Sequence, residues 1–424
     1  MNPGPGSQRS GIIASRHLDR KPTLPKHLPC GRLAHCSALP EDDAVTPPCP
    51  APDTPSLTAL ADQCVQCGLC LPVCPTYGME ALEAESPRGR IALIKAWETG
   101  TAAPTPSGEA HLDACLGCRH CETVCPAGVR YGDLLAGARV RQRARRPASA
   151  GQRMTEWLTA HPRAMTALLT TYRIVWPLLP ARARPLPRPP APPETPCPRA
   201  TEADATATLF TGCVARGYDA SLHAALHRLG GAIGLRIVVP DDQGCCGSLH
   251  AHAGDAGRAE KLTARNRAAF AGQRTVLSLA SGCHEALADG LRGQCEVRDA
   301  LDVVAERAAR LRFANRAERV ALHLPCTQRN LVRSVGALHA LLARVPGLEI
   351  VPLDAGFGCC GAAGTQMLSD PGRAARFRQP LLDQLAASGA TRLLSANTGC
   401  RLHLANGTAL PVQHPLEFLA ECLA

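Results

Sequence analysis

The chain has 424 residues, enough for two or three domains, and 45% of them are apolar, so sizeable cores can form. The formal net charge is +10, but the sequence carries no nucleic-acid-binding motif, and aromatic residues make up only 3% of the chain. We therefore expect no nucleic-acid partner. No run of 18 apolar residues occurs, which argues against a membrane-spanning helix.

Cysteine is the informative residue type, with 22 copies in the chain. An even, high count in a short secreted protein indicates disulfides. This chain is long, however, and its first residues lack the apolar core of a signal peptide. Many of the cysteines occur as C-x-x-C, which in a cytosolic protein indicates metal binding. We therefore expect a cytoplasmic metalloprotein.

Residues 1–56 are rich in Pro, Gly, Ser and Arg and show no hydrophobic period. They are interpreted as a disordered segment, or as an extension that results from a start codon assigned too early. Cys30, Cys36 and Cys49 lie here at spacings that fit no cluster motif, so we expect them to be spectators.

Residues 57–150 contain two dense cysteine runs and are predicted to form one mainly helical domain. The runs are Cys64-x-x-Cys67-x-x-Cys70-x-x-x-Cys74-Pro75 and Cys115-x-x-Cys118-x-x-Cys121-x-x-x-Cys125-Pro126. Three thiolates at this spacing can wrap one face of a cubane cluster. The fourth cysteine is expected to start a helix, because the proline after it suits a first helical turn. Zinc, the alternative, needs only paired C-x-x-C knuckles, without a third cysteine at the same spacing.

Both runs resemble the C-x2-C-x2-C-x3-C-P pattern of two-cluster bacterial ferredoxins, in which the fourth cysteine of each run ligates the other cluster. The resemblance implies two 4Fe–4S clusters, one held by Cys64, Cys67, Cys70 and Cys125, the other by Cys115, Cys118, Cys121 and Cys74. Gly68 and Gly117 are expected to let backbone amides approach the sulfides closely. A helix predicted over residues 87–97 connects the runs, and its arginines are expected to form a solvated basic face.

Residues 151–200 begin with an apolar stretch, Met154 to Leu179, which is predicted to be helical. Arg163 and Arg173 interrupt it. Three roles remain open: contact with a membrane surface, docking on a flavoprotein, or packing on the cluster domain as a helix pair, and we prefer the last. The proline-rich linker that follows, residues 180–198, is predicted to be extended.

Residues 201–310 and 311–424 are two copies of an internal repeat. Each copy contributes four cysteines, offset by 113 to 117 residues: Cys213, Cys245, Cys246 and Cys283, then Cys326, Cys359, Cys360 and Cys400. Short apolar runs alternate with helical stretches, which predicts two tandem α/β domains with parallel sheets. Each cysteine follows a predicted strand, so we expect each set to converge at the carboxyl edge of its sheet.

The eight repeat cysteines are candidate ligands of further metal or iron–sulfur clusters. The adjacent pairs are poor disulfides, because neighbouring Cα atoms lie about 3.8 Å apart and a relaxed disulfide spans about 4.4–6.8 Å. Buried structural thiols and redox-active thiols are the alternatives. Residues 356–361 match G-x-G-x-x-G, but the following segment, 371–387, is predicted to be helical and supplies no strand-ending acidic residue, so we expect no nucleotide there.

Two ferredoxin motifs followed by two C…CCG…C domains resemble the iron–sulfur subunit of bacterial glycolate oxidase. The segment from Ser395 to His414 is the closest match, and the resemblance covers roughly residues 57–424. It implies FAD-binding partner subunits that oxidise glycolate to glyoxylate, with D-lactate as a second candidate substrate. This chain would pass electrons toward a quinone-type acceptor, peripherally on the inner face of the cytoplasmic membrane, and would not oxidise substrate alone.

The cysteine-rich domains also resemble those of heterodisulfide reductase, which end in C-x-x-C and hold non-cubane clusters. This sequence departs from that pattern, because Ala286 and His403 stand where the last cysteine is expected. His403 is either a replacement ligand or a hydrogen-bonded histidine, and the same two interpretations apply to His284 and His414. Alternative functions are the iron–sulfur subunit of an anaerobic glycerol-3-phosphate dehydrogenase, a lactate utilisation complex or a heterodisulfide reductase-like complex, and a thiol or disulfide reductase.

Overall fold

The structure is a computed structural model that describes residues 55–191, 205–354, 356 and 358–424. The interpretation of residues 1–54, with Cys30, Cys36 and Cys49, lies outside the described residues. So does the last part of the predicted linker, residues 192–198.

The two cysteine runs lie in a helical region, as predicted. Its elements are α1 (Leu57–Asp62), α2 (Pro75–Glu80), η1 (Glu83–Glu85), α3 (Pro87–Glu98), α4 (Pro106–Asp113), α5 (His120–Thr123) and α6 (Tyr131–Arg145). Ser56, Ser86 and Thr105 begin α1, α3 and α4, because their side-chain oxygens accept backbone N–H groups that the first helical turn leaves unpaired. Ile94, Leu112 and Leu134 form the centre of a core between these helices.

The two C-P sequences behave differently. Cys74 stands directly before α2, and Pro75 is the first residue of that helix, as predicted. The expectation is wrong for the second run, because Pro126 lies in a turn and the next helix, α6, begins only at Tyr131. Gly128, with φ of 62°, adopts the left-handed conformation that interrupts a helix at this point.

The apolar stretch after α6 forms a helix pair, as predicted. Its elements are α7 (Ala150–Ala160), α8 (Pro162–Val175) and the short helices η2 (Trp176–Leu178) and η3 (Ala181–Ala183). α7 meets α6 through an ion pair between Glu156 and Arg143. α8 packs on the repeats, where Leu169 lies in one cluster with Tyr218 and Leu402. The pair therefore bridges the cysteine-run region and the repeats.

The two repeats have matching elements. The first contains β1 (Ala205–Leu209), α9 (Ala215–Tyr218), α10 (Ala220–Ala232), β2 (Leu235–Val238), α11 (Ser248–His252), α12 (Ala256–Ala269), β3 (Thr275–Ser278), α13 (Ser281–Gly290), β4 (Glu296–Asp299), α14 (Ala300–Glu306) and η4 (Ala308–Arg310). The second contains β5 (Glu318–His323), η5 (Gln328–Val332), α15 (Val335–Leu342), β6 (Leu348–Leu353), α16 (Gln366–Ser369), α17 (Pro371–Ala387), β7 (Arg392–Ser395), α18 (Thr398–Ala405), β8 (Val412–Gln413) and α19 (Pro415–Glu421).

Each repeat contains a parallel four-stranded sheet, which confirms the predicted α/β class. The strand orders are β2-β1-β3-β4 and β6-β5-β7-β8. In the first sheet, Thr208 of β1 pairs with Val238 on one side and Val276 on the other. The chain changes direction across the sheet at β1/β3 and at β5/β7, and the carboxyl ends of strands at such a switch point form a crevice for ligands.

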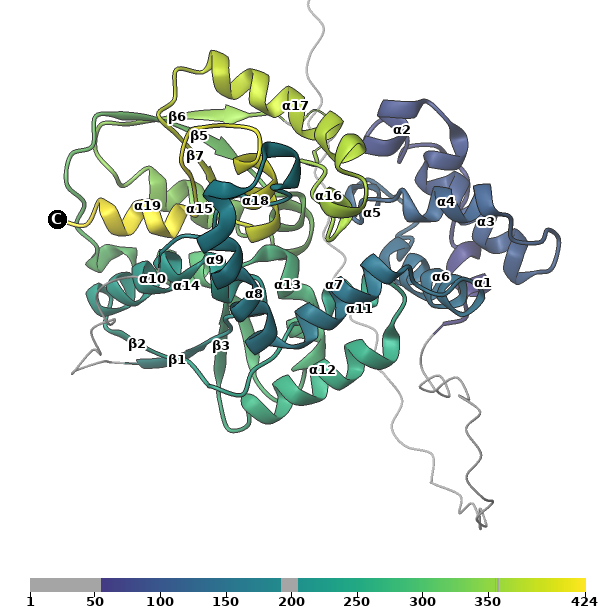
Figure 1. The fold of residues 1–424 in the computed structure, drawn as a ribbon, viewed down its shortest axis with the longest axis horizontal. Coiled ribbons are helices and arrows are strands. Elements are labelled where there is room, and N and C mark those ends of the chain that lie inside the picture. The colour runs from purple at the N-terminus through teal and green to yellow at the C-terminus, as the bar shows by residue number, and fades with distance from the viewer. Residues whose placement is uncertain (1–54, 192–204, 355, 357) are drawn as a thin grey trace, which may run out of the picture. The chain divides into compact units, whose positions relative to one another are not determined.

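The two repeats share one hydrophobic core. α10 of the first repeat packs on α19 of the second, and α14 of the first packs on α15 of the second (Figure 1). Residues of both repeats, such as Leu226, Val304, Leu341 and Phe418, belong to one buried cluster. Since α10 corresponds to α15 and α14 to α19 in the repeat, each copy contributes the same two helices to a reciprocal interface.

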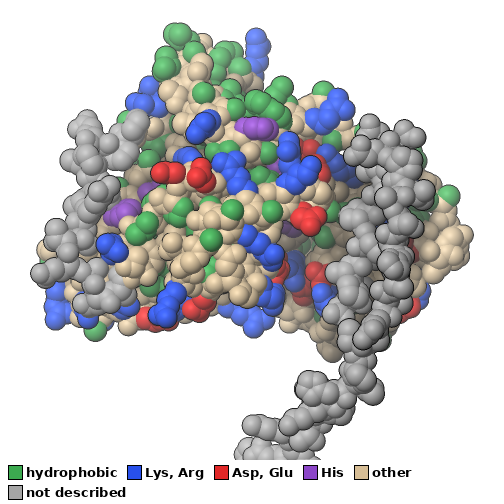
Figure 2. Space-filling model, turned by 90° about the horizontal axis from the view of Figure 1, so that it is seen from below, with side chains coloured by type: hydrophobic (Ala, Val, Ile, Leu, Met, Phe, Trp, Pro, Cys, Tyr) green, Lys and Arg blue, Asp and Glu red, His purple; other side chains and the backbone are tan. Residues whose placement is uncertain are grey.

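The surface charge is mixed on the face drawn in Figure 2. Lys and Arg side chains alternate there with Asp and Glu side chains, and small apolar patches lie between them. The net positive charge of the chain is thus not gathered into one field on this face.

Candidate iron–sulfur site

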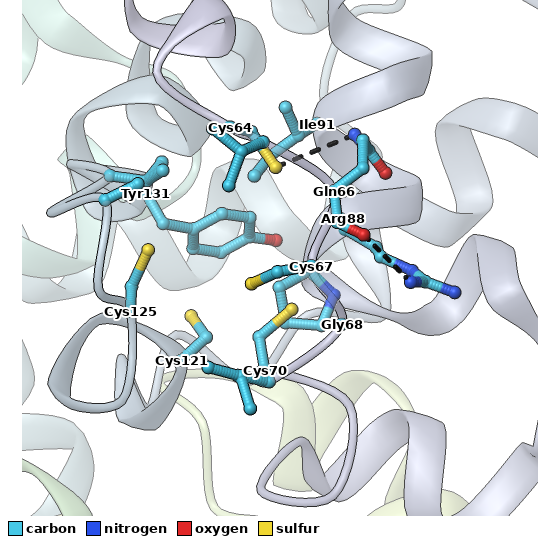
Figure 3. A pocket seen from close by; sticks show the side chains of 15 residues that line it. Cys64, Gln66, Cys67, Gly68, Cys70, Arg88, Ile91, Cys121, Cys125 and Tyr131 are labelled. Atoms are coloured by element: carbon cyan, nitrogen blue, oxygen red, sulfur yellow. Dashed lines mark hydrogen bonds between the residues drawn. The ribbon is translucent and has the colours of Figure 1, made fainter.

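The first cysteine run borders a hollow of about 440 Å³, part of which is open to solvent. Five cysteines line it: Cys64, Cys67, Cys70, Cys121 and Cys125. Figure 3 shows these cysteines around the hollow, with the ring of Tyr131 reaching into it. Cys67 is exposed, so this hollow lies at the surface of the protein.

The loop of the first run is held by its backbone conformation and by one arginine. Gly68 has φ of 84°, which residues with a Cβ rarely adopt. A Cβ at this position would also lie 2.9 Å from Arg88 Nη1. Arg88 donates to Gln66 O at 3.2 Å and forms an ion pair with Glu83 at 2.6 Å. These contacts fix the loop from its solvent side.

A second hollow, of about 300 Å³, adjoins the first. The cysteines that line it are Cys74, Cys115, Cys118 and Cys121. Cys121 and Tyr131 line both hollows. Cys74, Cys118 and Cys121 are buried, so the second hollow is the more enclosed of the two. The four cysteines that the ferredoxin pattern assigns to each cluster all line the corresponding hollow.

The donor chemistry of both hollows fits iron–sulfur clusters, because at least four thiols line each one and ligation by four cysteines is usual for such clusters. Among the described residues, no group of three His, Cys, Asp or Glu side chains is placed to hold a single metal ion. The thiols surround a volume instead of a point.

Burial and nearby cations shift the pKa values of the thiols around the second hollow in opposite directions. Burial raises the pKa of the Cys118 and Cys121 thiols. Burial also disfavours the Cys115 thiolate, but the guanidiniums of Arg90 and Arg139 outweigh it and lower the pKa of Cys115. Because thiolates are the ligands of iron–sulfur clusters, the buried Arg90 and the partly buried Arg139 favour the ligating form of Cys115.

Arg90 is fully buried, so the expectation of a solvated basic face on α3 is wrong at this residue. Its Nη2 lies 2.7 Å from Glu85 Oε2. The same carboxylate lies 2.8 Å from His111 Nδ1 and 3.0 Å from Arg373 Nη2 on α17. Glu85 thus joins the cysteine-run region to the second repeat.

In the first repeat the four cysteines meet at the carboxyl edge of the sheet, as predicted. Cys213 follows β1, and its Sγ lies 3.6 Å from Cys245 Sγ, after β2. Cys245 and Cys246 belong to one buried cluster, against which Cys283, in the first turn of α13, also packs. Gly247 follows the pair with φ of 85°, and its N–H points to Cys245 Sγ at 3.5 Å.

The second repeat repeats this geometry. Cys326 packs on the cluster that contains Cys359, and Cys360 and Cys400 lie together in another buried cluster. The N–H of Gly361 lies 3.4 Å from Cys359 Sγ, which matches the first copy. The second copy has in addition a hydrogen bond of 3.3 Å from Asn397 Nδ2 to Cys400 Sγ. Both sets therefore present four thiols at one edge.

The cysteines of the second repeat lie next to the second hollow. Cys118 and Cys359 belong to one buried cluster, against which Cys326 also packs. Asn330 Nδ2, on η5, donates to Cys118 O at 2.8 Å. Arg329 Nη2, also on η5, donates to Gly358 O at 2.8 Å. η5 thus connects the loop of the second cysteine run to the loop before Cys359.

The three candidate histidines are held by hydrogen bonds away from the thiols. His403 Nε2 lies 3.0 Å from Ala374 O, and burial lowers the pKa of His403 to about 4. His284 Nδ1 lies 2.7 Å from Ser278 Oγ. His414 Nδ1 accepts the N–H of Leu416 at the start of α19. The structure favours the hydrogen-bonded interpretation for each.

Sequence reasoning missed Arg90, Glu85 and Asn330. The motif Ser86-Pro-Arg-Gly-Arg90 was a signal, because a serine cap followed by proline fixes the start of α3. That start places Arg90 on the turn that meets Glu85. Asn330 carried no signal, because its partner Cys118 is more than 200 residues away in the sequence.

Comparison with known proteins agrees with this geometry. Residues 60–129 match the family model of the 4Fe-4S dicluster domain, and residues 207–288 and 320–405 match that of the cysteine-rich domain. The fold and the site therefore define an iron–sulfur electron-transport protein that joins a dicluster domain to a pair of cysteine-rich domains.

Relatives narrow this class. The chain is 30% identical over 389 residues to the glycolate oxidase iron-sulfur subunit of Escherichia coli (strain K12), a match that covers 85% of this chain and 93% of the relative. It is 28% identical over 393 residues to the probable glycolate oxidase iron-sulfur subunit of Bacillus subtilis (strain 168), covering 81% and 88%. The dihydromethanophenazine:CoB–CoM heterodisulfide reductase of Methanosarcina barkeri has a subunit that is 25% identical over 427 residues, covering 88% and 98%. The chain belongs to the family of glycolate oxidase iron–sulfur subunits.

Proposed function

We propose that this chain is the electron-transfer subunit of a glycolate oxidase complex. FAD-binding partner subunits would oxidise glycolate to glyoxylate, with D-lactate as a second candidate substrate, and this chain would pass the electrons toward a quinone-type acceptor. The supporting observation is the arrangement of the run cysteines around two adjoining hollows that share Cys121. In this proposal the flavoprotein carries out the substrate chemistry, so the chain alone is not expected to oxidise glycolate.

We assign one 4Fe–4S cluster to each hollow. The proposed ligands are Cys64, Cys67, Cys70 and Cys125 for the first, and Cys115, Cys118, Cys121 and Cys74 for the second. Bound clusters would supply reversible one-electron storage. The chain's own residues set their surroundings: Tyr131 Oη lies 3.6 Å from Cys115 Sγ, and Thr76 Oγ1 lies 3.3 Å from Cys74 Sγ.

The eight repeat cysteines are proposed as ligands of additional iron–sulfur clusters. We favour the second repeat as the place that accepts electrons from the second hollow, because Cys326 and Cys359 pack against Cys118. The cysteines of this set are Cys326, Cys359, Cys360 and Cys400. In this proposal electrons enter at the exposed Cys67 side, reach the enclosed second hollow and continue to the edge of the second sheet.

A related complex is the second candidate. The iron–sulfur subunits of anaerobic glycerol-3-phosphate dehydrogenase, lactate utilisation and heterodisulfide reductase-like complexes would use the same cysteine sets with another flavoprotein. The absence of a closing C-x-x-C in both repeats, where Ala286 and His403 stand at the last position, favours the glycolate oxidase assignment over a heterodisulfide reductase-like one.

The deciding experiment is anaerobic co-purification from the native host with iron, sulfide and flavin quantitation. We expect at least about eight iron atoms per chain, as two 4Fe–4S clusters require, together with a flavoprotein that oxidises glycolate. A chain without iron, or a flavoprotein partner inactive with glycolate and D-lactate, would overturn the proposal. Glycolate oxidation by the isolated chain would contradict its assigned role.

Peripheral attachment of the complex to the inner face of the cytoplasmic membrane is part of this proposal. Among the helices of the described segments, none is long and apolar enough to cross a membrane. The α7–η2 surface exposes Trp157, Ile174 and Leu178, at 47%, 70% and 85%. Arg153 on α7 and Arg163 on α8 are exposed as well, and a surface that combines cations with apolar side chains suits an anionic bilayer.

A further inference from the structure

Arg90 is a buried cation at the wall of the second hollow. It lines this hollow together with Cys74 and Cys115. Its donors are fixed in several directions: Nε donates to His111 O at 2.6 Å, and Nη1 to Thr76 Oγ1 at 3.1 Å and to Glu85 O at 2.5 Å. Nη2 donates to Glu85 Oε2 at 2.7 Å. The guanidinium is therefore held in one position by the protein.

The charge of Arg90 is only partly balanced. Its counter-ion, Glu85, also pairs with Arg373 at 3.0 Å, so one carboxylate serves two guanidiniums. Arg139 adds a further cation, because its Nη2 donates to Cys115 O at 3.0 Å. The wall of the second hollow thus carries a surplus of positive charge.

The first hollow has a different environment. Its arginine, Arg88, is partly exposed and forms its ion pair with Glu83 at the surface, where water and salt screen both charges. A buried charge is screened far less. The two hollows therefore differ in the fixed charge that acts on whatever they hold.

We propose that Arg90 is a positioning residue that raises the reduction potential of the group bound in the second hollow. One-electron reduction adds one negative charge at this place without breaking a bond, and a fixed cation stabilises the reduced form. Net charge, hydrogen bonds and solvent exposure set the potentials of iron–sulfur clusters. This inference rests on the proposed function, since it takes Cys74, Cys115, Cys118 and Cys121 as ligands.

The inference implies a direction of electron transfer. A raised potential in the second hollow makes it an acceptor for electrons that arrive at the first, which is the more exposed. The negative charge of Glu85 opposes that of Arg90, so Glu85 lowers the reduction potential of the group in the second hollow. Because Glu85 also pairs with Arg373 of α17, its one negative charge is shared between two guanidiniums and offsets that of Arg90 only in part.

The test is a redox titration of the full chain, reconstituted without air and followed by electron paramagnetic resonance. Arg90→Met should lower the potential of one cluster and leave the other unchanged. Glu85→Gln should raise the potential of that same cluster. Arg292→Met is the matched control, because it removes an equal charge from an exposed ion pair with Asp289, and it should leave the potentials of both clusters unchanged.

The two variants are expected to shift the potential in opposite directions, and this distinguishes an electrostatic effect from a loss of local structure. A residue that only holds the loop would give shifts of the same sign, or none, in Arg90→Met and Glu85→Gln, and either result would overturn the inference. If Arg90→Met fails to bind iron, Arg90→Lys and Glu85→Gln decide: Lys should keep the wild-type potential, and Gln should still raise it. A wild-type chain without iron would reject the proposed function as well, whereas intact clusters with unmoved potentials would reject this inference alone.

Discussion

Arg401 and Asp219 form a buried ion pair across the two repeats, with Arg401 Nη2 2.7 Å from Asp219 Oδ1. Asp219 precedes α10 of the first repeat, and Arg401 lies on α18 of the second, one residue after Cys400. Thr398 Oγ1 donates to Asp219 Oδ2 at 2.7 Å, and Arg401 Nη1 lies 3.4 Å from Glu417 Oε2. A cysteine-bearing helix is thus anchored by a charge from the other repeat.

Removing the charge of Asp219 should destabilise the protein strongly. Asp219→Asn leaves Arg401 buried with Glu417 as its remaining partner, and breaking a buried pair in this way costs about 3 kcal/mol or more. The measurement is the urea midpoint of the anaerobic protein, followed by circular dichroism. Asp289→Asn, in an exposed pair with Arg292, is the control and should shift the midpoint little. Equal midpoints for both variants would contradict the prediction.

Replacing one cysteine should remove the cluster of the first hollow and leave that of the second. Cys67→Ala should remove about half of the iron that two 4Fe–4S clusters contribute, and spare the signal of the second cluster, because Cys67 lines the first hollow only. Cys295→Ala is the control, since Cys295 belongs to neither run and to neither repeat set, and should keep all iron. Iron and sulfide analysis with electron paramagnetic resonance measures both. Loss of both cluster signals in Cys67→Ala would speak against independent sites.

Asp299 should make stability fall as pH rises. Burial raises its pKa to about 6, above an ordinary value of about 3.9, so between these values the folded protein binds a proton that the unfolded chain has lost. The contribution of protonated Asp299 to the free energy of unfolding is therefore lost as pH rises, by about 1 kcal/mol between pH 5 and pH 7. Asp299→Asn should abolish this contribution, because the amide still accepts the N–H of Leu301 and can bond to Ser334. The measurement is the urea midpoint of the wild type and of the variant at pH 5 and at pH 7. If the midpoint changed equally with pH in both proteins, the prediction would be contradicted.

The glycine after the second CC pair should resist substitution. Gly361 has φ of 85°, and a Cβ there would lie 2.7 Å from Ala374 O and 2.6 Å from Phe377 Cβ. Gly361→Ala should therefore lower the free energy of unfolding by more than about 1 kcal/mol. Gly336→Ala is the control, because that position in α15 is open and helical, and it should be neutral or stabilising. A denaturation midpoint of Gly361→Ala at or above that of the control would refute this.

The α7–η2 surface should bind anionic vesicles. The full chain is expected to sediment with phosphatidylglycerol vesicles more than with phosphatidylcholine vesicles, and high salt should weaken this binding. Trp157→Glu with Ile174→Glu should reduce it several-fold, whereas Val238→Glu, at an exposed apolar position of β2, should not. Equal binding of the double variant and the wild type would exclude this surface. Binding only to a flavoprotein would assign the surface to protein docking.

Local patterns predicted much of the fold. The helix predicted over residues 371–387 is α17, and the strand before Cys213, predicted at residues 208–211, is found at Ala205–Leu209. Such elements depend mainly on nearby residues. Cys125 shows the limit of such reasoning: Pro126 permits a helix, but the chain forms a turn there, Gly128 has a positive φ, and the next helix begins at Tyr131. Ser86 and Pro87 indicated the start of α3, but the burial of Arg90 was out of reach, since it also depends on His111, which meets Arg90 only in three dimensions. The contact of Cys118 with Cys359 likewise needs the repeats to fold against the cysteine runs.

The exchange of helices between the repeats has a consequence for synthesis on the ribosome. α10 buries Leu222, Leu226 and Leu229, yet part of its covering layer comes from α19, which begins almost two hundred residues later. The apolar face of α10 therefore stays partly exposed after the first repeat has left the ribosome. Until α19 has been made, proteases can cleave this repeat and chaperones can bind it. Although the repeats look like independent copies along the sequence, they must mature together.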